Sequence, residues 1–149
     1  MSPFKARAAA ATGDMRLKML HAAIEGEAGF AINDCELLRP PPSWTIDTVL
    51  EIRQRETDSE IYLLIGEDNV ATLDRWQRFD ELKKMVRFVV LDRTGSQTQR
   101  DYQTVRRKID ISATDIRKRV ARGQSIRYLV PPAVEEIIQR EKLYREQSK

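Results

Sequence analysis

The sequence has few of the residues that most often carry covalent or metal chemistry. It contains one cysteine, Cys35, and one histidine, His21, in 149 residues. A single cysteine cannot form a disulfide within the chain, and this usage is typical of a reducing compartment, so we expect a cytoplasmic protein. One histidine gives no pair for acid–base catalysis or metal binding, and we predict no protein-held metal site. A Cys–His nucleophile is unsupported as well.

Long apolar runs and glycine-rich phosphate loops are also absent. No stretch approaches the ~18 apolar residues that a membrane span requires, so we expect no membrane partner. The 6 glycines form no P-loop. With 41% hydrophobic and 33% charged residues, the composition is that of a soluble globular protein. We therefore predict a single domain over residues 1–149, long enough to bury a core.

Charge is distributed unevenly along the chain. Residues 1–86 carry 11 basic and 15 acidic side chains, whereas residues 87–149 carry 15 basic and 8 acidic ones. A basic C-terminal half suits a phosphate-rich ligand. Solvated helix faces would give the same pattern. Nucleic acid is the less favoured partner, because no aromatic-rich binding motif accompanies the arginines.

Apolar periodicity predicts strands that alternate with helices. Helices are expected over 14–24, 45–55, 73–85 (in two pieces, interrupted near Trp76), 112–121 and from 131 onward. Strands are expected over 30–37, 61–65, 87–91 and 105–111, with a polar loop over 92–103. The apolar run 61–65 is typical of a parallel strand covered on both faces. This order of elements predicts an α/β fold with a mainly parallel sheet.

Gly66 and Asp68 directly follow the predicted strand 61–65. Ligands of open α/β sheets lie beyond the carboxyl ends of the strands, where glycine allows close approach and an aspartate can accept hydrogen bonds from ribose hydroxyls. An ordinary strand-to-helix turn, with Asp68 as a helix cap, explains the same residues equally well.

A second candidate site opens the predicted helix 112–121, just after Ile111. Ser112 and Asp115 have the spacing of a capping box, and the free amides of a helix start attract anions. Ser112 and Thr114 add hydroxyl donors, and Arg117 lies one turn further, within reach of a bound phosphate. A plain capped helix is the competing interpretation.

Two further residues could contact a ligand. Trp76 follows Arg75 in a polar break between helices, where an indole could stack on a flat heterocycle or simply pack. Thr45 could donate to a ligand, or either Thr45 or Ser43 could cap the helix that follows. For both tryptophan and threonine, the structural role is the commoner one.

In their order and spacing these segments resemble the bacterial nicotinate-nucleotide adenylyltransferases, nucleotidyltransferases with a Rossmann-like fold. The similarity covers nearly the whole chain. The matching stretches are Arg16-Leu17-Lys18-Met19-Leu20, Ser43-Trp44-Thr45-Ile46-Asp47-Thr48, Leu64-Ile65-Gly66-Glu67-Asp68, Arg75-Trp76, Arg87-Phe88-Val89-Val90, Ile111 to Arg117, and Ser125-Ile126-Arg127-Tyr128-Leu129-Val130-Pro131.

The resemblance implies adenylyl transfer from ATP to nicotinate mononucleotide in NAD biosynthesis, with Mg²⁺ accompanying ATP. Trp76 would stack on the pyridine ring, Thr45 would help to hold the nicotinate end, and Lys5 would face phosphate. Lys5 is the weaker match, because Phe4 precedes it where the family has histidine. The implied ATP-binding residues are Gly66, Asp68, Ile111, Ser112, Thr114 and Arg117.

The family's opening Gly-Gly-x-Phe-Asp-Pro-x-His-x-Gly-His motif has no counterpart here, so the catalytic residues are unassigned. We expect an N-terminally shortened family member that on its own is marginally stable, associates into oligomers or aggregates, and shows no detectable turnover. The alternatives are a non-catalytic nucleotide- or partner-binding remnant of the family, or another small nucleotidyltransferase such as a pantetheine-phosphate type.

Overall fold

The computed structural model describes residues 11–92, 102–106 and 111–145. Contacts between residues divide the chain into two compact units. Of the described residues, 40–92 and 102–106 form what we term the sheet unit, and 11–39 and 111–145 form the helical unit. Each is described by itself. The prediction of a single domain stays a prediction.

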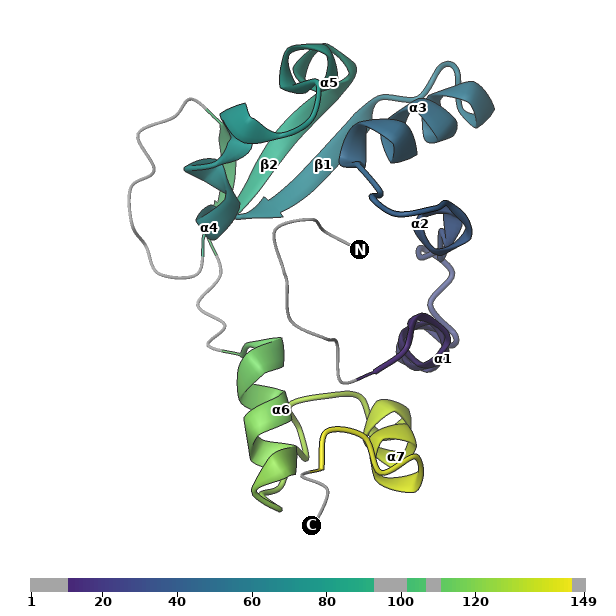
Figure 1. Cartoon of the computed structure of the whole chain (residues 1–149), viewed down its shortest axis with the longest axis vertical. Coiled ribbons are helices and arrows are strands. Elements are labelled where there is room, and N and C mark those ends of the chain that lie inside the picture. Colours follow the sequence, from purple (N-terminus) through teal and green to yellow (C-terminus); the bar gives the residue numbers. More distant parts are fainter. Residues whose placement is uncertain (1–10, 93–101, 107–110, 146–149) are drawn as a thin grey trace. The chain divides into compact units, whose positions relative to one another are not determined.

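The sheet unit contains three strands, with one helix before β1 and further helices between β1 and β2 (Figure 1). Their bounds are α3 (Thr45–Arg55), β1 (Ile61–Gly66), α4 (Glu67–Val70), the 3₁₀ turn η1 (Leu73–Arg75), α5 (Phe79–Met85), β2 (Val86–Asp92) and β3 (Gln103–Arg106). The predicted helix 73–85 is therefore two pieces separated at Trp76, as expected.

The sheet is parallel throughout, in the order β1-β2-β3. Its register pairs Ile61 with Val86 at one end of β1 and Gly66 with Leu91 at the other. An α/β fold with a parallel sheet is thus confirmed, and the carboxyl ends of β1 and β2 lie side by side, where ligands of such sheets bind.

One face of the sheet carries the core of this unit. Ile65 of β1 and Phe88 and Val90 of β2 pack with Ile46 of α3 and Leu82 of α5, and all five are buried. The other face of β1 differs from the prediction of a strand covered on both sides, because Leu64 is 60% exposed. The run 61–65 is apolar throughout, but its alternate residues face different surroundings.

The helical unit contains α1 (Gly13–Ala23), α2 (Cys35–Leu38), α6 (Ala113–Ala121) and α7 (Pro132–Arg140). Its core is formed by Ile116, Ile126, Val134 and Ile138, with apolar side chains of α1 packed at its margin. Lys18 Nζ of α1 donates to Glu141 Oε1, just after α7, over 2.9 Å. The three long helices were predicted correctly from their apolar spacing.

The strand predicted over 30–37 is wrong. Residues 30–34 are in neither helix nor strand, and Cys35–Leu38 form α2. The cause is local hydrogen bonding: Asn33 Oδ1 accepts from the Cys35 amide over 3.1 Å, and Asp34 O accepts from the Leu37 amide over 2.8 Å. Asn side chains readily start such turns, and here the turn that Asn33 starts overrides the apolar alternation.

Several predictions fall partly or wholly on residues outside the described ranges. These are the role of Lys5, most of the loop 92–103, and residues 107–110 of the third strand. Where it is described, the predicted third strand has other bounds, because β3 begins at Gln103 and Ile111 is in neither helix nor strand. Within the described ranges, no helix has both the length and the apolar character that crossing a membrane requires.

Candidate functional site

The carboxyl end of β1 leads directly into a short helix. Gly66 is the N-terminal flanking residue of α4, with an extended backbone at φ −72° and ψ 151°. Asp68 is exposed in the single turn of α4, and its Oδ1 accepts from Asn69 Nδ2 over 3.2 Å. Asp68 is therefore not a helix cap, and it lies just beyond the carboxyl end of β1.

The start of α3 has no side-chain cap. Trp44, not Ser43 or Thr45, is the flanking residue, so the predicted capping role of both hydroxyls is wrong. Thr45 is the first helical residue and is half-buried. Ser43 is 7% exposed, and its Oγ has no hydrogen-bond partner in the described structure. A helix start with free amides therefore lies beside a buried, unused hydroxyl.

Trp76 lies between η1 and α5 and packs, half-buried, at the margin of the sheet unit's core. Two residues later Arg78 has a left-handed backbone, φ 53°, and donates through Nε and Nη2 to Glu81 over 2.8 and 2.6 Å. These hydrogen bonds raise the pKa of Arg78, and the charge of Asp47 adds to the effect. Asp47 is in the first turn of α3, and α3 packs with α5 in the core of this unit through Ile46 and Leu82.

In the helical unit, α6 begins as the sequence suggested. Ser112 is its cap, and Ser112 Oγ accepts from the Asp115 amide over 3.0 Å. The capping box is only half formed, because Asp115 Oδ2 instead accepts from Arg119 Nε over 3.0 Å. Arg117 Nη2 reaches back to Thr114 Oγ1 over 3.0 Å. This contact holds a guanidinium beside the open amides of the helix start.

The predicted site residues thus fall into two sets. Thr45, Gly66, Asp68 and Trp76 belong to the sheet unit. Ile111, Ser112, Thr114 and Arg117 belong to the helical unit, where Ile111 is partly exposed just before the helix start. Lys5 lies outside the described residues.

Two side chains near these sets were not singled out as ligand contacts from the sequence. Ser43 was considered only as a cap, and its burial depends on packing that a motif does not reveal. Asp92 was counted as the first residue of a polar loop. It instead ends β2 as a residue only 3% exposed, at the same edge of the sheet as Gly66. Because residues 92–103 are mostly polar, the sequence did not indicate that Asp92 belongs to the strand.

His21 and Cys35 lie in the helical unit. His21 is exposed in the last turn of α1. Cys35 is buried, and its Sγ accepts from Arg39 Nη2 over 3.3 Å. Among the described residues, no three His, Cys, Asp or Glu side chains gather as metal ligands would.

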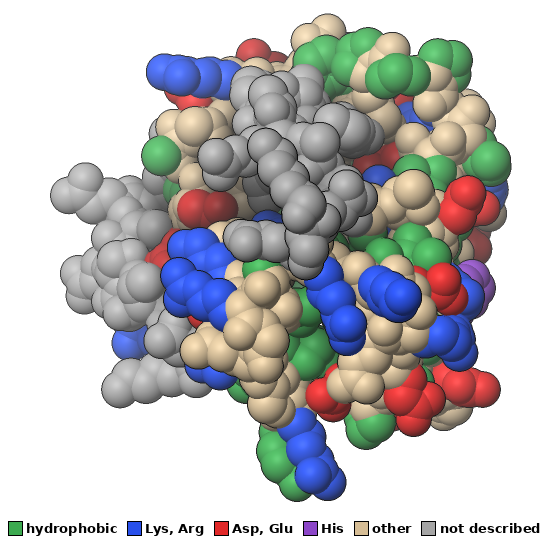
Figure 2. Space-filling view, turned by 60° about the horizontal axis from the view of Figure 1, so that its bottom comes forward, with side chains coloured by type: hydrophobic (Ala, Val, Ile, Leu, Met, Phe, Trp, Pro, Cys, Tyr) green, Lys and Arg blue, Asp and Glu red, His purple; other side chains and the backbone are tan. Residues whose placement is uncertain are grey.

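Basic side chains are not confined to the start of α6. On the surface that Figure 2 turns toward the viewer, Lys and Arg side chains form separate groups, with acidic side chains among them. On α6, Arg119 pairs with Asp115, so part of the basic charge of this helix is balanced within it.

The family model described as cytidylyltransferase-like matches residues 2–119. A protein of Shouchella clausii named "Probable nicotinate-nucleotide adenylyltransferase" is 43% identical over 145 residues, which cover 95% of this chain and 76% of that protein. A protein of Rhodopirellula baltica with the same name is 34% identical over 161 residues, covering 97% and 75%.

Solved structures agree in fold. One from Vibrio parahaemolyticus has a TM-score of 0.69 at 22% identity and covers 90% of this chain and 72% of its own. The Plasmodium falciparum nicotinic acid mononucleotide adenylyltransferase complexed with NaAD has a TM-score of 0.67 at 16% identity, covering 88% and 73%. At these identities, the likeness shows the fold alone.

Proposed function

The chain belongs to the cytidylyltransferase-like family and, within it, to the nicotinate-nucleotide adenylyltransferases, and from this membership we propose that it transfers the adenylyl group of ATP to nicotinate mononucleotide. The products are nicotinate adenine dinucleotide and pyrophosphate, and the reaction is a step of NAD biosynthesis. The cytoplasm is the compartment that we propose for it.

The start of α6 is the observation that best supports this function. The amides of Ala113 and Thr114 have no partners within the helix, and Arg117 folds back toward them through Thr114 Oγ1. A helix dipole, open amides and a guanidinium together favour a multiply charged anion. The triphosphate of ATP is such an anion.

We assign the remaining predicted residues to the two substrates. Gly66, Asp68 and Ile111 line the nucleoside side of ATP, and Ser112, Thr114 and Arg117 hold its phosphates. Trp76 stacks on the pyridine ring, and Thr45, with the open start of α3, receives the nicotinate carboxylate. Lys5 faces the mononucleotide phosphate.

The reaction is a direct displacement. A phosphate oxygen of the mononucleotide forms a bond to the α-phosphorus of ATP, and the bond from that phosphorus to the oxygen bridging toward the β-phosphate breaks. Pyrophosphate leaves with the electron pair. Such transfers depend mainly on positioning and charge neutralisation. Mg²⁺ bound to ATP supplies part of that neutralisation, and Arg117 adds to it on the protein side.

Turnover assays of the purified chain test the proposal. With ATP, Mg²⁺ and nicotinate mononucleotide, formation of pyrophosphate and nicotinate adenine dinucleotide in equal amounts would support the proposal and would overturn the expectation of no detectable turnover that the missing histidine motif implies. Parallel reactions contain phosphopantetheine or nicotinamide mononucleotide instead. Product with phosphopantetheine alone would assign the chain to the pantetheine-phosphate type. ATP binding without any turnover would identify a non-catalytic nucleotide-binding protein.

A further inference from the structure

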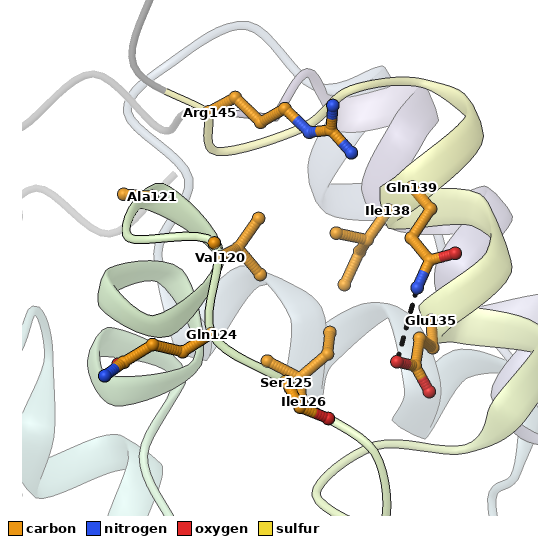
Figure 3. A pocket seen from close by; sticks show the side chains of 10 residues that line it. Val120, Ala121, Gln124, Ser125, Ile126, Glu135, Ile138, Gln139 and Arg145 are labelled. Atoms are coloured by element: carbon orange, nitrogen blue, oxygen red, sulfur yellow. Dashed lines mark hydrogen bonds between the residues drawn. The ribbon is translucent and has the colours of Figure 1, made fainter.

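A pocket of about 640 Å³ lies within the helical unit, at the end of α6 opposite Ser112 (Figure 3). Its walls come from the last turn of α6, the segment after it, α7 and Arg145. Its size is within the range of small-molecule sites in proteins. Within the helical unit, the residues that we assign to ATP stand at the start of α6, and none of them lines this pocket.

The apolar part of the pocket is anchored in the core. Val120, Ile126 and Ile138 line it, and the last two are each 3% exposed and belong to the core of the helical unit. Side chains held in this way keep their positions when a ligand enters. A ligand therefore meets a fixed aliphatic surface.

Two opposite charges border this aliphatic surface. Figure 3 shows Arg145 and Glu135 well apart, with Val120 and Ile138 between them in that view. Glu135 Oε1 accepts a hydrogen bond from the neutral Gln139 Nε2 over 3.3 Å. Arg145 has no ion-pair or hydrogen-bond partner within the described part of the chain. Each charge is therefore available to a ligand.

We propose that this pocket binds a small molecule with an ammonium group and a carboxylate at opposite ends of an apolar middle, such as an ω-amino acid or a short apolar peptide. The carboxylate pairs with Arg145, the ammonium group pairs with Glu135, and the middle covers Val120 and Ile138. A purely apolar ligand would desolvate the two charges without pairing them. A ligand with only a carboxylate would gain the ion pair with Arg145, but the charge of Glu135 would repel it.

A series of chain lengths tests the separation of the charges. The probes are β-alanine and the terminal-amino forms of butyrate, hexanoate and octanoate, titrated into the full chain and followed by NMR shifts of α6 and α7 amides. We expect an affinity optimum at one intermediate length. Hexylamine and hexanoate each carry one charge, and each should bind at least about tenfold more weakly than aminohexanoate.

Two variants identify the partners of the two ends. Glu135→Gln should weaken aminohexanoate and hexylamine but should not weaken hexanoate. Arg145→Gln should weaken aminohexanoate and hexanoate but should not weaken hexylamine. Glu136→Gln and Arg140→Gln are matched controls, because both lie on α7 and neither lines the pocket. Thermal melts check that every variant is folded.

Three results would overturn the proposal. The first is the absence of binding by every probe at millimolar concentration. The second is an equal response of all probes to both charge variants, which would indicate general electrostatic attraction. The third is the same loss in the control variants. ATP binding should stay unchanged in Glu135→Gln and Arg145→Gln, which separates this pocket from the proposed adenylyltransferase site.

Discussion

The helices α3 and α6 begin in different ways, although both starts belong to the proposed substrate sites. Ser112 caps one amide at the start of α6, because its Oγ accepts from the Asp115 amide. The start of α3 has no side-chain cap, and the nearby Ser43 hydroxyl is buried without a partner among the described residues. One helix start therefore has a side-chain cap, whereas the other has none and lies beside an unused hydroxyl.

The two helices also differ in how deeply they are packed. Helix α3 places Ile46 and Val49, 1% and 2% exposed, in the core of the sheet unit. Helix α6 buries only Ile116, 8% exposed, and carries charged side chains over most of its surface. A deeply packed helix can hold an unsatisfied hydroxyl in place, because packing supplies the stability that the missing hydrogen bond does not.

The largest effect should come from removing the core contact of α3. Ile46→Ala should lower the free energy of unfolding by about 3 kcal/mol, whereas Ile116→Ala should cost about 2 kcal/mol, because the α6 site is less buried and can relax. Both tryptophans, Trp44 and Trp76, lie in the sheet unit. Urea unfolding followed by tryptophan fluorescence therefore reports on that unit, and circular dichroism reports on all helices.

The fluorescence transition should shift strongly in Ile46→Ala and little in Ile116→Ala. Equal fluorescence shifts in both variants would mean that the two units unfold as one. A larger shift for Ile116→Ala would contradict the difference in packing between the helices.

The next effect concerns the anion site at α6. Arg117→Ala should weaken ATP binding roughly 10- to 150-fold, because it removes a charge-assisted contact to phosphate. Arg119→Ala is the matched control: Arg119 is on the same helix and pairs with Asp115 at the surface, where ion pairs contribute little. Calorimetric titration with ATP gives both values. An equal loss of ATP affinity in the two variants would show that ATP is attracted by the general positive charge of α6 and has no specific site at its start.

A comparable loss of affinity is expected for nicotinate mononucleotide when Trp76 of the sheet unit is replaced. Trp76→Leu keeps an apolar side chain but removes the indole face, and should weaken nicotinate mononucleotide roughly 5- to 150-fold while leaving ATP nearly unchanged. Phe79→Leu is the control, because Phe79 packs at the margin of the same core. If Trp76→Leu lowers the melting temperature and weakens both substrates equally, Trp76 is a packing residue.

The sequence predicted the parts of the fold that depend on local patterns. The helices around Leu17, Val49 and Val134 follow from apolar spacing, and the parallel sheet follows from the alternation of elements. The predicted strand over 30–37 failed because Asn33 and Asp34 form local hydrogen bonds that periodicity does not represent. Motifs located the start of α6 and its cap Ser112.

Three-dimensional packing determined what the motifs could not. The sequence Ser43-Trp44-Thr45 offers two hydroxyls as caps, but the backbone makes Trp44 the flanking residue and leaves Ser43 buried. The packing of Ile46 with Leu82 joins segments that are distant in sequence, and only the fold brings them together. The roles of Thr45, Asp68, Trp76 and Arg117 in substrate binding stay predictions, and the variants above test those of Trp76 and Arg117.

The smallest effect gives the most direct comparison, since the same substitution is made at both helix starts. Ser112→Ala removes a cap that accepts from the Asp115 amide, and should lower the free energy of unfolding by about 1 kcal/mol. Ser43→Ala removes a buried hydroxyl without a partner among the described residues, and should be neutral or stabilising by up to about 1 kcal/mol. Thermal and urea unfolding measure both changes in stability.

If the Ser43 hydroxyl binds a ligand, Ser43→Ala should also bind nicotinate mononucleotide more weakly, although its stability is unchanged or higher. A destabilised Ser43→Ala protein would show instead that the hydroxyl has a structural partner, and the two helix starts would then be alike.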